Sequence, residues 1–422
     1  MLKKILQKRE LFWTFLYQLT ALLGGLVLIK LLSKILAVEV YGHYVLITSI
    51  VALIVMLPFS ALMQGVNRYL SIYQIKNRYN KFFTTVVILH VAIVFLYIFS
   101  LMIVKLVVPL DGLWVDIYYL IAAFAISEIF KVLLRTINNA NRERKNILQS
   151  TFLEFTLKIG LSYFAYSLAL IDIRYLLFIY ILANSLSVIV MLNKNKSAFQ
   201  LNSINAKESK IIIIRIWAFS SPLIIWAVFG WLRDMSNRWY VDHFLDKEHV
   251  ALFSMMASIA MIAPTALLGL VGGYYMPILY QKDNDDKGYI RRFLVKLLPV
   301  VALVFFLSIF ITFIFKDYIV LIVSDEKYLK AAWMLPWMFI VFCIYTMSMM
   351  ATYEIFAHKQ TKRLIISNVL PGLISIVGGY ILIKSHGIEG ALYNYILTYL
   401  SYAVLTFYVV FKYSNENRIT RI

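Results

Sequence analysis

One long apolar stretch, between Ile211 and Leu245, constrains the fold of this chain more than any other feature. It exceeds the roughly 20 residues that a helix needs to cross a bilayer, and Pro222 removes one backbone hydrogen-bond donor within it. Arg233, Asp234 and Arg238 follow where a lipid-facing helix would be aliphatic. Charges inside a span need water, a partner or a ligand. We therefore expect a membrane helix that is not straight and has one polar face, on which Asp234 and Arg238 have the spacing and order of an ion pair.

The composition indicates that the whole chain is a polytopic membrane protein. It has 422 residues, of which 62% are hydrophobic, and its mean hydropathy is +0.78. Soluble domains are nearer half apolar. The net charge of +19 does not indicate a nucleic-acid partner, because the Lys and Arg residues gather between apolar runs. The single cysteine, Cys343, excludes a disulfide framework and a cysteine-based metal site.

Hydropathy predicts an all-α protein with about twelve membrane-spanning helices in two lobes. The predicted spans are residues 11–31, 44–63, 82–104, 114–134, 151–170, 175–192, 211–241, 251–280, 293–315, 331–353, 364–383 and 391–411. The first of them is read as an uncleaved span and not as a signal peptide. The polar segment 194–210 is predicted to be a cytoplasmic linker between a six-helix lobe, residues 1–193, and a second one, residues 211–422.

Basic residues concentrate in alternate loops, which predicts the orientation of the chain. These loops are residues 3–9, 68–81, 135–145, 194–210, 282–292, 359–363 and 418–421. The loops between them are short and more acidic. Both termini are therefore predicted to be cytoplasmic, with an even number of spans.

The two halves contain a weak internal repeat. Glu39, Gly42 and Tyr44 recur as Glu248, Ala251 and Phe253 at the same spacing. Residues 140–145 similarly match residues 357–362, and residues 180–182 match 395–397. Three matches in the same order indicate a duplication with parallel topology.

Together with this architecture, three short motifs resemble the polysaccharide flippases of the multidrug/oligosaccharidyl-lipid/polysaccharide exporter superfamily, the Wzx-type O-antigen transporters in particular. The motifs are Lys34–Tyr44, Gln64–Tyr69 and Met235–Trp239, the last downstream of Pro222. The resemblance implies a MATE-like, two-lobed alternating-access transporter in the bacterial inner membrane. It also implies a substrate, an undecaprenyl-diphosphate-linked oligosaccharide used for O-antigen or a related surface polysaccharide.

The charged residues inside the predicted spans suit such a substrate, because a diphosphate needs cations and a glycan needs aromatic and polar walls. Candidate substrate-binding residues are Lys30, Arg233, Arg238, Lys131 and Arg135. Lys30 and Arg238 occupy nearly the same position in the two repeats. Candidate ion-coupling acids are Asp234 and Glu128. Flippases of this kind often carry Asp directly before the arginine of the seventh span; here Asn237 stands there, and Asp234 is the available acid.

Several of these residues also have a simpler interpretation. Lys30 can extend to lipid headgroups, whereas Lys131 and Arg135 can be cytoplasmic-side anchors. Glu128 has the i,i+3 spacing of an ion pair with Lys131, and Glu154 and Lys158 have the i,i+4 spacing of a salt bridge.

The sequence leaves more than one function open. Nucleotide-binding and metalloprotease motifs are absent, so no cofactor and no enzymatic activity are expected. Besides the lipid-linked substrate and membrane lipids, other polysaccharide-assembly membrane proteins are candidate partners. The alternatives are a multidrug or organic-cation antiporter of the same superfamily and a polytopic polysaccharide polymerase. An organic cation would favour a net acidic cavity, and a polymerase usually carries a long external loop.

Cysteine labelling tests the predicted topology. With a membrane-impermeant maleimide, Lys196→Cys and Asn284→Cys should be labelled only from the cytoplasm, and Asp246→Cys only from the periplasm. Cys343 lies within an apolar span, so the wild-type protein should not react with the maleimide. Labelling of Asp246→Cys and Lys196→Cys from the same side would contradict the twelve-span topology.

Overall fold

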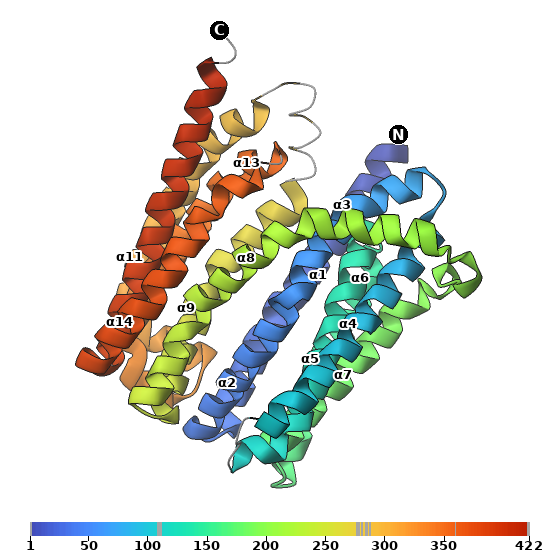
Figure 1. Cartoon of the computed structure of the whole chain (residues 1–422). Coiled ribbons are helices and arrows are strands. Elements are labelled where there is room, and N and C mark those ends of the chain that lie inside the picture. Colours follow the sequence, from blue (N-terminus) through green and yellow to red (C-terminus); the bar gives the residue numbers. More distant parts are fainter. Residues whose placement is uncertain are drawn as a thin grey trace. The chain divides into compact units, whose positions relative to one another are not determined.

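The computed structural model of the chain describes residues 2–107, 112–275, 279, 282, 286, 288–358 and 360–419, and nearly all of these residues are helical (Figure 1). Asn284 and parts of the basic loops near residues 282–292, 359–363 and 418–421 lie outside the described residues. The chain divides into two compact units, residues 1–28 with 47–228 and residues 29–46 with 229–422. These units are called unit 1 and unit 2. The lobe boundary at residues 194–210 stays a prediction.

Three helices contribute residues to both units: α1 (Leu2–Ile35), α2 (Val38–Ile54) and α8 (Ala206–Phe244). Unit 1 continues with the π-helical segment Val55–Ser60, α3 (Ala61–Ile75), α4 (Tyr79–Val107), α5 (Leu113–Ala140), α6 (Arg144–Ser167), α7 (Ile173–Asn193) and the short 3-10 helices Lys196–Ala198 and Leu201–Ser203.

Unit 2 is built around α12, which packs against α9, α11 and α14. Its elements are α9 (Lys247–Leu270), the π-helical segment Val271–Tyr275, α11 (Tyr289–Val323), the 3-10 segment Glu326–Met334, α12 (Leu335–Ala351), α13 (Tyr353–Ala357), the 3-10 helix Thr361–Leu364 and α14 (Ile366–Ile419). Gly272 and Gly273 lie in the π-helical segment. Pro222 lies inside α8, which is assigned as one continuous helix.

Ten helical segments of the described residues are long and apolar enough to cross a membrane. Two contacts add two more crossings. Arg174, at the start of α7, pairs with Asp116, at the start of α5, at 3.0 Å. Since α5 and α7 begin at the same end of unit 1, α6 must return the chain across. Arg363 likewise pairs with Glu416, so α14 crosses twice, and Gly387 breaks it with a φ of +58°. The described helices can therefore cross a membrane twelve times, which agrees with the predicted number.

Loops predicted to share a side of the membrane contact one another within each unit. In unit 1 the predicted cytoplasmic residues Gln74 and Asn141 share a hydrogen bond of 2.8 Å. In unit 2 the predicted periplasmic residues Lys330 and Glu248 form an ion pair. These contacts agree with the predicted alternation of loops. Which side is cytoplasmic stays a prediction.

Residues of the internal repeat fall at corresponding places in the helices. Glu39 lies in the first turn of α2 and Glu248 in the first turn of α9. Ala140 ends α5, and its counterpart Ala357 ends α13. These two repeated pairs therefore lie near helix ends.

Three helices of unit 1 end in a Schellman turn, in which the residue after the cap adopts the left-handed conformation usually given to glycine. In this chain those residues are Asn77, Arg142 and Ala169, with φ values of 53°, 60° and 56°. The turn at Ala169 is closed by hydrogen bonds from its N–H to the Tyr166 carbonyl at 3.0 Å and from the Leu170 N–H to the Ala165 carbonyl at 2.9 Å. Alanine is the least suited of the three because its Cβ clashes there and its side chain offers no compensating hydrogen bond.

Replacement of Ala169 by glycine should therefore stabilise the protein by about 1 kcal/mol, since the relief of strain outweighs the entropy that glycine adds to the unfolded chain. Thermal unfolding of the purified protein in detergent measures the effect. As a control, Ala165→Gly, inside α6, should lower stability by about 1 kcal/mol. Destabilisation by both changes would contradict the strain assigned to Ala169.

Candidate functional site

A buried cluster of charged side chains lies among α5, α6 and α7 of unit 1. Each helix contributes polar residues spaced three or four apart, so that they share a face. The members are Glu128, Lys131 and Arg135 of α5, Glu154 and Lys158 of α6, and Tyr180 and Asn184 of α7. The helices pack closely against one another. We call this set the unit 1 cluster.

Glu154 is the centre of the unit 1 cluster. Its Oε1 accepts hydrogen bonds from Lys131 Nζ at 2.9 Å and Lys158 Nζ at 2.7 Å. Its Oε2 accepts from Arg135 at 3.1 Å. The Lys158 ammonium also lies 4.4 Å from the centroid of the Tyr180 ring, a favourable cation–π distance. Three cations thus converge on one carboxylate that is 6% exposed.

Glu128 completes the unit 1 cluster on its more open side. Its Oε1 accepts from Lys131 Nζ at 2.6 Å and from the Asn184 amide at 2.9 Å, and its side chain is 19% exposed. The predicted i,i+3 pair is therefore present, but Lys131 also bonds to Glu154. With two carboxylates and three cations, the cluster has a formal charge of +1. An excess cation of this kind attracts an anion or disfavours further protonation nearby.

A second buried cluster, in unit 2, surrounds Arg233. Its guanidinium forms a two-point ion pair with Asp234, at 2.7 and 3.1 Å, and donates to Asn368 Oδ1 at 2.8 Å. Three tyrosine rings enclose it, with centroids at 5.0, 5.4 and 4.7 Å; they belong to Tyr345, Tyr399 and Tyr402. The arginine is 2% exposed. We call this set the unit 2 cluster, and it is formally neutral.

The expected ion pair between Asp234 and Arg238 is not formed. Asp234 binds its neighbour Arg233, and its Oδ1 accepts from the Tyr399 hydroxyl at 2.7 Å. Arg238 instead donates to Ser254 Oγ at 3.2 Å and contacts Met235. The reason is that a buried guanidinium needs its charge neutralised more than the partly exposed Arg238 does.

Lys30 has a structural partner of its own. Its Nζ donates to the carbonyl oxygens of Leu321 and Ser324, both at 2.5 Å, at the end of α11. In return, Lys327 donates to the Lys34 and Leu36 carbonyls at the end of α1. A lysine on terminal carbonyls complements the negative end of a helix dipole. The described contacts thus bring Arg233 and Asp234 together, and Glu128, Lys131 and Arg135 together, but join Lys30 to neither group.

Several residues of both clusters were not predicted as site residues. Spacing along the sequence predicts only a salt bridge between Glu154 and Lys158, and nothing in the sequence singles out Asn184. A signal existed for the tyrosines: Tyr395, Tyr399 and Tyr402 repeat at helical spacing on one face of α14. Aromatic residues in membrane helices are mostly packing residues, however.

The chain resembles known proteins in structure and not in sequence. No protein-family model and no curated protein matches the sequence. A solved structure described as the inward-facing conformation of a multidrug resistance MATE family transporter of the MOP superfamily superposes with a TM-score of 0.74, at 12% identity over 96% of each chain.

Two further solved structures show the same likeness. A point mutant of the Vibrio cholerae MATE transporter VcmN has a TM-score of 0.71, at 12% identity over 97% of this chain and 96% of that one. The inward closed conformation of the lipid II flippase MurJ has a TM-score of 0.68, at 15% identity over 97% of this chain and 87% of that one. The chain has the fold of MATE transporters and MurJ. This MATE-like fold confirms the expected all-α membrane architecture.

The unit 1 cluster generates a stability prediction. Glu154→Gln should destabilise the protein by about 3–5 kcal/mol, because it leaves the buried Lys158 ammonium without a carboxylate, whereas Lys131 keeps Glu128. Thermal unfolding in detergent measures the loss.

The matched control is Asp116→Asn, which breaks the exposed pair with Arg174 at 3.0 Å. Exposed pairs contribute about 0–1 kcal/mol, so this change should have little effect. Equal effects of the two substitutions would contradict the central role of Glu154.

Proposed function

We propose that the chain is a flippase that moves diphosphate-lipid-linked oligosaccharides across the bacterial inner membrane by alternating access. The fold supports a transporter, since MATE transporters and the lipid II flippase MurJ share it. Within that fold, the choice of an anionic substrate rests on the charges of the two buried clusters.

The observation that carries the proposal is the excess of cations over acids. The two clusters contain four cations and three acids, and each acid is paired with a cation. An anionic diphosphate can use the remaining positive charge. An organic cation would need a carboxylate that is not already neutralised.

One arginine in each unit has donors left for a phosphate. Arg135 is about one-third exposed, makes one hydrogen bond to Glu154 Oε2, and its buried Nε finds no partner among the described residues. Arg238 is also partly exposed. A guanidinium offers two parallel donors to phosphate oxygens, which an ammonium cannot do. We therefore propose Arg135 of unit 1 and Arg238 of unit 2, each in its own unit, as phosphate contacts in preference to Lys30, Lys131 and Arg233, whose contacts are already described.

Ion coupling in this proposal uses the two partly exposed acids. Glu128 neutralises Lys131, and Asp234 neutralises Arg233; both cations are almost fully buried. A proton or cation that binds either carboxylate weakens the ion pair and favours a rearranged state of that unit. Glu128→Gln and Asp234→Asn are the matching neutral variants.

A multidrug transporter is the second candidate. Two of the superposed structures are MATE transporters, and the Tyr345, Tyr399 and Tyr402 rings form a wall that suits an organic cation. In this chain, however, Arg233 occupies that wall. Because the Arg233 guanidinium already contacts the three rings, the flippase proposal is favoured over an organic-cation transporter.

Reconstitution of the purified protein into liposomes tests the function. Liposomes receive a polyprenyl-diphosphate oligosaccharide with a fluorescent group on the glycan, and an impermeant quencher reports which molecules remain outside. The protein should increase the rate at which the labelled lipid moves from one leaflet to the other and so changes its access to the quencher. Arg238→Ala and Arg135→Ala should each slow it by roughly 10- to 100-fold, the effect of losing a hydrogen bond to a charged group, and Arg238→Lys should retain part of the rate.

The control variant is Arg142→Asn, since the exposed Arg142 forms a surface ion pair with Glu10 at 3.7 Å and asparagine tolerates the left-handed backbone at this position. It should leave the rate unchanged. The proposal is wrong if the wild-type protein leaves the lipid-linked glycan on its original side while transporting an organic cation such as ethidium.

A further inference from the structure

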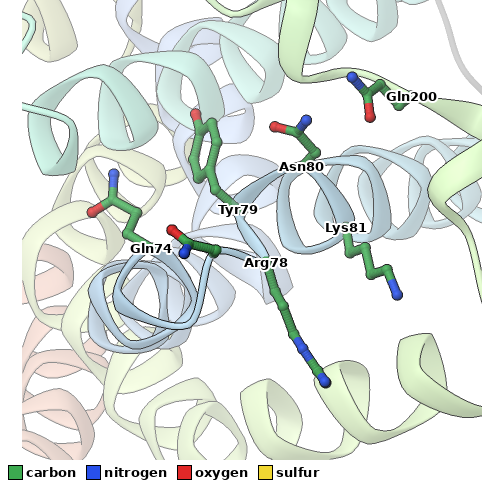
Figure 2. Close-up of a pocket in the computed structure, with 7 residues that line it drawn as sticks. Gln74, Arg78, Tyr79, Asn80, Lys81 and Gln200 are labelled. Atoms are coloured by element: carbon green, nitrogen blue, oxygen red, sulfur yellow. The ribbon is translucent and has the colours of Figure 1, made fainter.

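A basic cavity opens in unit 1 where α3 turns into α4. It has a volume of about 530 Å³ and is lined by Gln74, Asn77, Arg78, Tyr79, Asn80, Lys81 and Gln200 (Figure 2). A smaller cavity of about 180 Å³ shares Arg78 and Lys81 with it and is also lined by Tyr73, Lys76, Glu208, Ile211, Ile212 and Arg215. None of these residues belongs to the two buried clusters.

The wall of the larger cavity is held in place by hydrogen bonds. Gln74 donates to Asn141 Oδ1 at 2.8 Å, Asn141 donates to the Tyr79 hydroxyl at 2.7 Å, and that hydroxyl donates to Asn195 Oδ1 at 3.0 Å. The Schellman turn centred on Asn77 fixes the backbone, with the Arg78 N–H bonded to the Tyr73 carbonyl at 2.8 Å. A prearranged wall of this kind lowers the entropy cost of binding.

The two cavities together carry an excess of positive charge. Four cations line them, Lys76, Arg78, Lys81 and Arg215, against one acid, Glu208. Glu208 lies 3.0 Å from Lys81 Nζ and 3.6 Å from Arg78, so it neutralises part of the charge of these two cations. Arg78 and Lys81 extend to the same side of the turn (Figure 2), which suits two or more oxygens of one anion.

Exposed apolar side chains adjoin the charged lining. Ile75, at the end of α3, is 84% exposed, and Phe199 and Leu201 flank the lining residue Gln200. Ile211 and Ile214 are exposed on α8 beside Arg215. Such side chains belong in the acyl region of a bilayer, whereas the neighbouring cations belong at headgroup level. This combination of side chains is typical of a site at the boundary between hydrocarbon and water.

We propose that this basic cavity binds the phosphate of an anionic membrane lipid, with Arg78 and Lys81 on the phosphate, the amide side chains of Gln74, Asn77, Asn80 and Gln200 available to the headgroup, and the acyl chains against the apolar residues. The phosphate chemistry alone would also suit a free anion. The adjoining apolar side chains favour the lipid. Glu208 competes with the phosphate for the two cations.

Native mass spectrometry of the full-length protein in detergent tests this site, with phosphatidylglycerol and phosphatidylcholine as the probes. Wild type should retain phosphatidylglycerol in preference. The double variant Arg78→Gln, Lys81→Gln should bind it about 30-fold more weakly, which corresponds to about 2 kcal/mol for two interfacial cations. Glu208→Gln should bind it more tightly, because the competing carboxylate is gone. A loss and a gain from neighbouring neutral substitutions are not explained by misfolding.

The matched control is Arg174→Gln, which removes an exposed arginine at the start of α7. The Arg174 and Arg78 side chains are 56% and 55% exposed. It should not change lipid retention. The proposal is overturned if Arg174→Gln weakens binding as much as the double variant does, or if the double variant binds like wild type. It is also overturned if glycerol phosphate, which lacks acyl chains, competes as well as the lipid. No outcome depends on translocation, so the result stands apart from the flippase proposal.

Discussion

A charge within a membrane-spanning helix must be neutralised by another part of the protein, because hydrocarbon offers neither water nor counter-ions. This constraint decides how the helices of each unit pack. Glu154 draws α5 and α6 together through Lys131, Lys158 and Arg135. Arg233 similarly joins α8 to α12 and α14 through Asp234, Asn368 and the three tyrosines. Each cluster thereby specifies which helix faces meet, as general hydrophobicity cannot.

Much of the fold could be read from the sequence because it depends on quantities that are local in the chain. Span length and the alternation of basic loops predict twelve helices, and the contacts of Asp116 with Arg174 and of Arg363 with Glu416 agree with that count. The repeated Glu39 and Glu248 likewise lie in first turns of helices. Hydropathy and helix-end chemistry need no knowledge of the partner helices.

The candidate site was less predictable, since the partners of its residues lie on helices that are far apart in the chain. Spacing on one helix favoured Asp234 with Arg238, but the deciding partners of Asp234 are Arg233 and the distant Tyr399. Lys30 looked available until the end of α11 supplied its acceptors. Spacing predicts which residues share a helix face, and only packing determines what that face meets.

The charges of α6 also bear on how the chain enters the membrane. On its own this helix is not among the ten apolar spans, and in lipid its Glu154 and Lys158 would have only each other as partners. Its counter-charges, Lys131 and Arg135, reside on α5, the helix made just before it during synthesis. We therefore expect the two helices to enter the membrane together, with the ion pairs between them already formed. The same contacts that hold unit 1 together would then act first as a condition for its insertion.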